Sequence, residues 1–173
     1  MTVNTRTSIF ETNSSSSHSI TLCISPSKCM DSIPLTDDGD ACIYPGEFGW
    51  GPSQHNDAPT KASYCLVHAM SSIPSRWKNA DSEDLHDDGK PRGPQDAENE
   101  ELALPLVQML ERVIKRGTNC NAVKFIPTHD GYRWGYIDHQ SVHVPTDIFK
   151  DDDVLFGFIF NPKSELCVDN DNH

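Results

Sequence analysis

The sequence predicts an α+β fold in which a mainly antiparallel sheet carries two helices packed on one face. Two stretches have apolar residues at the three-to-four spacing of a helix, and the last third of the chain is rich in strand-forming residues divided by turn signals. The 173 residues suffice for one domain, and 12 prolines with 10 glycines indicate short elements joined by loops. We therefore expect a single domain over residues 1–173.

The N-terminal part predicts strands and a long loop. Residues 8–24 predict a strand, a serine-rich loop and a second strand at 20–24, which alternates and contains β-branched residues. Residues 25–59 combine prolines and glycines with Asp and Ser, and they predict a long loop. Within it, residues 43–51 bring aromatic side chains together with turn formers. This stretch is either a hairpin or an exposed aromatic binding loop.

Two helices are expected. The first covers 60–72, with Asp57 and Thr60 available as caps. Its apolar positions are Ala62, Cys65, Leu66, Ala69 and Met70. The second helix ends at 115–117, and Pro105 either opens it or kinks a longer helix. Its apolar stripe consists of Leu106, Met109, Leu110, Val113 and Ile114.

Residues 81–101 differ in composition from the rest of the chain. They hold nine acids against two bases, a formal charge of −7, and glycines and prolines interrupt them. This pattern predicts an acidic linker or a surface loop. The acids are Asp81, Glu83, Asp84, Asp87, Asp88, Asp96, Glu98, Glu100 and Glu101.

The last third of the chain predicts a sheet. Turn formers occur at 130–131 and 161–163. The segment 154–160 is apolar on both faces, so we expect it to be the central strand. The expected strands are 122–126, 132–138, 154–160 and 164–168.

The overall composition excludes several classes of protein. Six cysteines lie far apart without a Cys-x-x-Cys pair, which argues against a zinc ribbon or a thioredoxin-type site and favours reduced, mostly buried thiols. No apolar run approaches the ~20 residues that cross a bilayer, and a signal-peptide core is lacking. The expected location is therefore the cytoplasm.

The formal net charge of −12 constrains the partners. An acidic surface repels nucleic acid phosphates and anionic membranes, so we expect no direct nucleic acid or membrane binding. The charge suits either solubility alone or docking onto the basic surface of another protein. The sequence leaves the oligomeric state open.

The serine-rich loop is the first candidate site. Its backbone amides and hydroxyls suit an anion-binding nest, with Asn13, Ser14, Ser15 and Ser17 as ligand-binding residues. In a catalytic interpretation Ser16 is the nucleophile and His18 the base. The alternative is a set of serine turns that cap strand ends, with His18 half buried against the sheet.

A second candidate lies near the end of the strand predicted at 132–138. Asp138, His139 and His143 offer a carboxylate and two imidazoles, so they suit a divalent metal or an Asp–His hydrogen bond that closes a turn. The spacing matches no zinc motif, and we predict no metal and no cofactor. Gly-rich phosphate loops, nucleophile elbows, His-Glu-x-x-His and dinucleotide fingerprints are all absent from the sequence.

The opening of the chain resembles that of a family of small bacteriophage and prophage proteins, on the run Phe10-Glu11-Thr12-Asn13-Ser14-Ser15-Ser16-Ser17-His18-Ser19. Residues 135–141 and the Asp- and Asn-rich tail at 169–173 are similar to later segments of that family. The resemblance implies a phage origin, and with it the cytoplasm of an infected bacterial host cell as the location. It also implies that the serine loop, the segment after 135 and the tail converge, which adds Gln140 and Ser141 to the ligand-binding candidates.

Three functions follow as hypotheses. The first is a phage accessory protein that binds a host or phage protein through its acidic 81–101 segment, as a nucleic-acid mimic or inhibitor. The second is a small nucleotide-binding protein, hydrolase or transferase that uses the serine loop with His18, Asp138 and His139. The third is a minor virion component.

Overall fold

A computed structural model describes residues 2–5, 16–23, 30–49, 51–71, 95–128, 134–137 and 146–170. For residues 2–5, 16–19, 71, 95–104, 146, 169 and 170 it describes the backbone alone. All structural statements below concern these residues.

The largest sheet has four antiparallel strands in the order β1 (Thr2–Thr5), β2 (Ser16–Cys23), β8 (Glu165–Asn170) and β5 (Ser53–His55). Residues far apart in the chain meet here, since Ile20 of β2 lies opposite Leu166 of β8, and His55 of β5 pairs with the same residue from the other side. The predicted strands at 20–24 and 164–168 are therefore confirmed as parts of β2 and β8. The strand predicted from residue 8 lies outside the described residues, and β1 at Thr2–Thr5 was not predicted.

Two further pairs of strands are parallel. β3 (Ala41–Ile43) pairs with β6 (Val123–Phe125), and β4 (Glu47–Phe48) pairs with β7 (Tyr136–Ile137). The expectation of a mainly antiparallel sheet is thus confirmed for the largest sheet only. The segment 25–59, expected to be loop, contains three short strands, and β3 and β4 pair with distant partners rather than with each other. The hairpin interpretation of 43–51 is therefore wrong.

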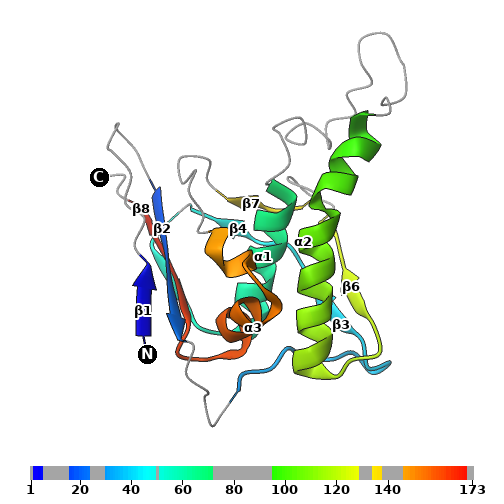
Figure 1. Cartoon of the computed structure of the whole chain (residues 1–173), viewed down its shortest axis with the longest axis horizontal. Helices are drawn as coiled ribbons and strands as arrows, with labels where there is room; N and C mark the ends of the chain where they lie inside the picture. Colours follow the sequence, from blue (N-terminus) through cyan, green and yellow to red (C-terminus); the bar gives the residue numbers. More distant parts are fainter. Residues whose placement is uncertain are drawn as a thin grey trace.

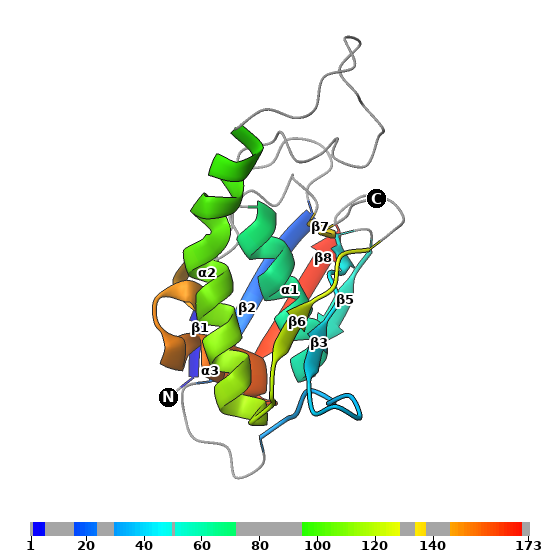
Figure 2. The same ribbon diagram turned by 90° about the vertical axis from the view of Figure 1, so that its right-hand side faces the viewer.

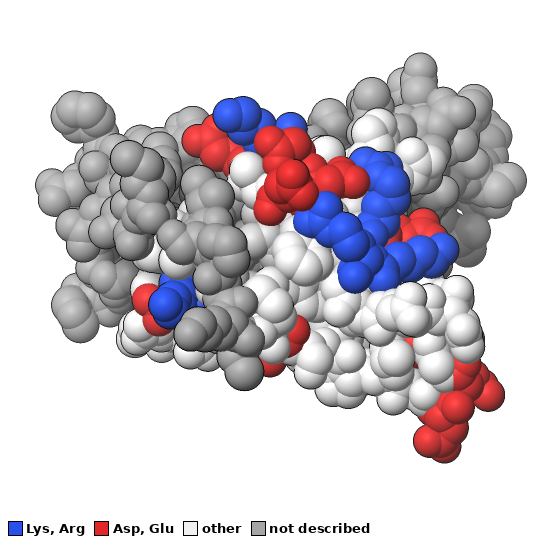
Figure 3. Space-filling view, turned by 60° about the horizontal axis from the view of Figure 1, so that its bottom comes forward, with Lys and Arg blue, Asp and Glu red and all other residues white. Residues whose placement is uncertain are grey.

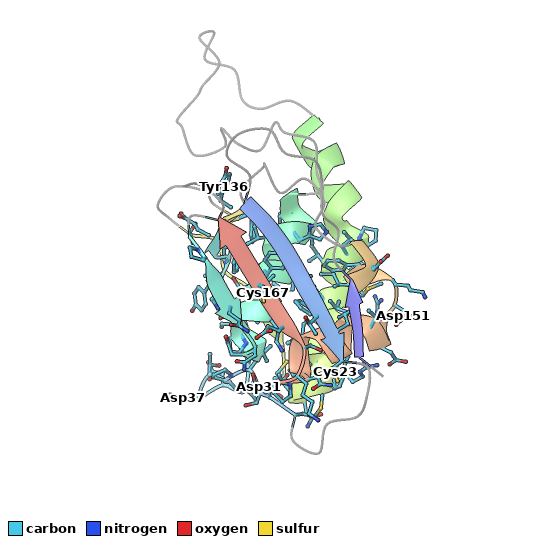
Figure 4. The ribbon with its side chains drawn as sticks, turned by 90° about the vertical axis from the view of Figure 1, so that its left-hand side faces the viewer. Cys23, Asp31, Asp37, Tyr136, Asp151 and Cys167 are labelled. Atoms are coloured by element: carbon cyan, nitrogen blue, oxygen red, sulfur yellow. The ribbon has the colours of Figure 1, made fainter. Side chains whose placement is uncertain are left out.

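The chain has the expected α+β composition, with its helices on one side of the four-stranded sheet (Figures 1 and 4). Helix α1 (Ala58–Ser71) lies between that sheet and α2 (Gln95–Thr118), and it contacts α2 and α3 (Asp152–Phe160) (Figures 1 and 2). A short 3₁₀ helix, η2 (Thr146–Phe149), precedes α3. Helix α1 is central, because most of its apolar side chains are fully buried: Ala62, Tyr64, Cys65, Leu66, Val67 and Ala69.

The prediction of a central strand at 154–160 is wrong, because this segment forms α3. Asp151 is the N-cap, and its Oδ1 accepts hydrogen bonds from the amides of Asp153 (3.0 Å) and Val154 (2.8 Å). Acidic residues in the first turn favour the helix start further. The run 154–160 is apolar on both faces because α3 is packed on several sides. The spacing of apolar residues alone does not distinguish such a helix from a buried strand.

Helix α2 is longer than predicted and begins at Gln95, so residues 95–101 of the expected acidic linker are helical. Pro105 lies inside the helix rather than opening it. The helix ends at Thr118, where Asn119 adopts a left-handed conformation (φ 55°) and its amide donates to the Lys115 carbonyl at 2.8 Å.

Ion pairs join α2 to the start of α3. Arg112 makes two hydrogen bonds to the Asp152 carboxylate (2.9 and 3.1 Å), and Arg116 contacts Asp153 at 2.8 Å. The Arg116 guanidinium also lies over the Phe156 ring, 4.2 Å from its centroid. Basic and acidic side chains consequently lie directly against one another on this face (Figure 3).

The predicted turn at 161–163 is confirmed, although it joins α3 to β8 rather than two strands. The turn predicted at 130–131 lies outside the described residues. No helix in the described part of the chain has the length and apolar character to cross a membrane.

Candidate functional site

The first part of the sequence-predicted site falls on β2. The backbones of Ser16, Ser17 and His18 form the start of this strand, opposite Asn170, Asp169 and Val168 of β8. The start of β2 and the end of β8 are therefore adjacent, while the convergence that the resemblance implied stays a prediction. The side chains of Ser16, Ser17, His18, Asp169 and Asn170 lie outside the described part of the structure. Several other candidates lie wholly outside the described residues: Asn13, Ser14, Ser15, Asp138, His139, Gln140, Ser141 and His143.

Strand β7 leads into the segment that contains Asp138. Figures 1 and 2 place β7 at the same end of the molecule as the start of β2 and the end of β8, and Tyr136 lies at that end in Figure 4. Gly135 precedes it with a φ of +76°, and a Cβ there would lie 2.3 Å from the Gly46 carbonyl oxygen. Glycine is thus required for β7 to approach the chain before β4 and form the Tyr136–Gly46 hydrogen bond of 3.0 Å.

The predicted partner-binding acids divide into two groups. Residues 81–94, with Asp81, Glu83, Asp84, Asp87 and Asp88, lie outside the described residues. The remaining four acids lie in the first two turns of α2, where the backbone alone is described: Asp96, Glu98, Glu100 and Glu101.

A groove that the sequence did not predict as a site opens beside the start of α1. Its volume is about 380 Å³, and β3, β4, the segment between them, β5 and α1 all contribute to its lining. The lining residues are Cys42, Ile43, Tyr44, Gly46, Glu47, Phe48, His55, Pro59, Thr60 and Ser63. Residues 42–44 and 46–48 of this lining belong to or adjoin the aromatic stretch at 43–51, for which the binding-loop interpretation stays a prediction.

Aromatic side chains shape this groove. Phe48 packs edge-on against both Tyr64 (5.1 Å between centroids) and His55 (6.4 Å), which fixes β5 against β4. Tyr44, by contrast, is 59% exposed, although it belongs to a chain with few exposed large hydrophobic side chains in its described part. Glu47 is also exposed, and no Lys or Arg lines the groove.

Two carboxylates cap the helix beside the groove. The Asp57 Oδ1 accepts the Thr60 amide at 2.8 Å, and the Asp31 carboxylate accepts the Ala58 amide. Burial alone would raise the pKa of Asp57, but the hydrogen bonds from Thr60 and the nearby His55 outweigh it and lower this pKa. The predicted cap at Asp57 is confirmed, and the positive end of the helix dipole is compensated from within the chain.

A buried polar junction lies on another side of α1. Lys61 is fully buried, and its Nζ donates to the carbonyls of Asn161 (3.0 Å) and Ser164 (3.1 Å) in the turn between α3 and β8. Burial lowers the pKa of this ammonium to about 8, against the raising effect of Asp31 and Asp57. The Phe158 ring lies 5.9 Å from Nζ.

The same junction fixes β2 to the turn. The Ser164 hydroxyl accepts the Cys23 amide at 3.0 Å and donates to the Gly157 carbonyl at 2.9 Å. The Asn161 side-chain amide donates to the Cys23 carbonyl at 2.8 Å. Backbone groups at the end of β2 and in α3 are thereby satisfied away from solvent.

Other ionisable side chains of α1 are buried as neutral groups. Burial raises the pKa of the Cys65 thiol and of the Tyr64 hydroxyl, and it lowers the pKa of His68 to about 4. His68 stacks on Phe149 with 5.5 Å between ring centroids. Deep burial makes these groups parts of the core rather than of an open site.

Metal-ligating residue types and cysteines are dispersed among the described residues. No three of their His, Cys, Asp and Glu side chains are grouped in a way that would hold a metal ion. No disulfide joins the cysteines of the described part, of which Cys23 and Cys65 are buried and the others are half-buried: Cys42, Cys120 and Cys167.

Comparison of the chain with protein-family models, with curated proteins and with solved structures gives no match.

Proposed function

We propose that the chain is an acidic, phage-encoded accessory protein that binds a host or phage protein through a basic surface of that partner. The phage origin comes from the N-terminal serine run, and the binding mode comes from the charge. A protein with a formal charge of −12 attracts cationic surfaces at long range and repels nucleic acid and anionic lipid.

The observation that carries this proposal is how the described bases are used. Lys124 pairs with Asp40 at 2.6 Å, and Lys115 pairs with Glu111 at 2.9 Å. Arg112 and Arg116 pair with aspartates of α3, and Lys61 is buried. Most of the described basic side chains are therefore paired with acids or buried, and the formal surplus of acids includes the −7 of residues 81–101.

Partner binding should depend steeply on salt and on the 81–101 acids. We expect a partner captured from bacterial lysate at about 50 mM salt to be lost at about 500 mM, because screening shortens the reach of exposed charges. Replacing the nine acids of 81–101 by amides should abolish binding, as measured by titration of the captured partner onto the full-length protein.

A matched pair of variants tests whether the position of the acids matters. Asp87→Asn with Asp88→Asn should weaken binding several-fold, whereas Asp37→Asn with Asp38→Asn removes the same charge from an exposed loop and should change little. Equal affinity for the wild type and the nine-amide variant, or a binding constant independent of salt, would contradict the proposal.

The register of β2 with β8 favours a second candidate, a nucleotide-binding protein or a hydrolase or transferase. Ser16 and Ser17 pair with Asn170 and Asp169, at the end of the sheet where β7 leads toward Asp138. Under this candidate His18→Ala removes nucleotide binding or turnover while Tm stays unchanged. A folded His18→Ala protein that retains full function would rule it out, and Ser19→Ala is the control on the same strand.

A further inference from the structure

We propose that the groove beside the start of α1 binds a lysine or arginine side chain of an extended peptide segment, with an apolar neighbour of that side chain packed on Tyr44. This inference rests on the proposed function, and it names the surface that takes a basic segment of the partner. The acids of 81–101 would then attract the partner, and the groove would hold one of its residues.

Charge decides between a cationic and an anionic occupant. Glu47 is an exposed carboxylate in the lining, and none of the lining residues carries a fixed positive charge. Two lysines adjoin the lining, since Lys61 follows Thr60 and Lys124 pairs with Cys42 in the sheet, but both are occupied elsewhere. Lys61 donates to carbonyls in the buried junction and Lys124 pairs with Asp40. An ammonium or guanidinium group in the groove thus meets a carboxylate and no competing lysine or arginine.

The helix end does not make this an anion site. A free helix N-terminus would attract an anion through its unsatisfied amides. Here the amides of Ala58 and Thr60 already bond the carboxylates of Asp31 and Asp57. These two carboxylates place further negative charge next to Pro59 and Thr60 of the lining, so an anionic occupant is disfavoured.

The exposed aromatic ring supplies the second part of the occupant's chemistry. Tyr44 and the buried Phe48 lie in the same groove lining, and Tyr44 keeps 59% of its surface in solvent. Covering such a ring with an aliphatic side chain removes apolar surface from water, and a cation beside the ring gains a further attraction. A peptide that alternates a basic and an apolar residue meets both requirements, whereas a bare cation meets only one.

The proposal is tested with a blocked pentapeptide, Gly-Leu-Lys-Leu-Gly, added to isotope-labelled full-length protein while amide chemical shifts are recorded. We expect shifts at Tyr44, Glu47, His55 and Thr60. Glu47→Gln should weaken binding about 5-fold, the factor that corresponds to a partly exposed ion pair of ~1 kcal/mol. Tyr44→Ser should also weaken peptide binding. Both substitutions replace exposed side chains, so Tm should stay unchanged.

The controls separate the groove from general acidity. Glu111→Gln makes the same chemical change on α2 and should leave peptide affinity as in the wild type. The peptide with glutamine in place of lysine should bind the wild type about 5-fold more weakly than the lysine peptide does. It should bind the wild type and Glu47→Gln with equal affinity. Absence of groove shifts at millimolar peptide, or equal affinity of the wild type and Glu47→Gln, would overturn the proposal.

Three further outcomes identify what has failed. Shifts confined to 81–101, with loss of binding in the nine-amide variant, would overturn the groove inference while the proposed function survives. Equal binding of butylamine and of the peptide would show that the groove accepts a small cation, which overturns the assignment to a peptide segment. Groove binding that persists in the nine-amide variant, with no salt-dependent partner, would support the groove and contradict the proposed function.

Discussion

Helix α1 separates two polar regions that begin one residue apart in the chain. Thr60 and Ser63 line the open groove, whereas Lys61 enters the buried junction with Asn161 and Ser164. In the junction, donors and acceptors bond one another away from solvent. In the groove, an exposed carboxylate and an exposed ring face open space. The junction therefore maintains the fold, and the groove is available to another molecule.

Burial explains why similar residue types differ in role. A polar group away from water costs free energy unless it is bonded, so junction residues are constrained by their partners. A serine or glutamate at the surface stays hydrated, so it contributes little to folding stability and its side chain can bond a ligand. Substitutions of the same kind in the two regions should therefore have different consequences.

The largest contrast at neutral pH is expected between two serine-to-alanine substitutions. Ser164→Ala leaves the buried Cys23 amide without its hydroxyl partner, whereas the Gly157 carbonyl keeps the hydrogen bond from the Asn161 amide. The free energy of unfolding should fall by about 2 kcal/mol. Ser63→Ala in the groove should change it by less than about 0.5 kcal/mol. Urea denaturation of both variants measures the difference.

The contrast fails if the two variants have equal stability. A Ser164→Ala protein as stable as the wild type would mean that other groups or water satisfy the Cys23 amide. The junction would then resemble the groove, and the division between a structural and a binding side of α1 would be lost.

Local patterns predicted the elements whose signals are unambiguous. The first helix was predictable because Asp57 caps it and its apolar residues recur at helical spacing, and the β8 strand follows a Pro-containing turn. The segment 154–160 was assigned to a strand because a fully buried helix has the same apolar run. The three aspartates at 151–153 were the available signal for a helix start.

Long-range pairing explains most of what the sequence did not predict. The parallel ladder of β3 with β6 joins residues about eighty positions apart, and no local period encodes it. The groove depends on that arrangement, so only its aromatic stretch was visible in advance. Lys61 was missed although it lies four residues before Cys65 on an apolar side of the helix, a position that implies burial.

A second effect, which depends on pH, sharpens the comparison at the junction itself. Lys61 holds its proton up to about pH 10.5 in the unfolded chain, but burial lowers its pKa to about 8 in the folded protein. Between these values the folded state binds fewer protons, so the wild type gains stability relative to Lys61→Met as pH rises. The gain should reach about 3 kcal/mol and should be absent below pH 8.

Denaturation of the wild type and Lys61→Met at several pH values between 7 and 10.5 measures this difference. Comparing the two proteins cancels the opposite contribution of Cys65 and Tyr64, whose raised pKa values make both proteins less stable at high pH. Lys115→Met serves as the exposed control, because the pKa of Lys115 is raised by its hydrogen bond to Glu111. A wild-type advantage that stays constant across this range would mean that Lys61 is solvated like a groove residue, and α1 would then have no buried charged side.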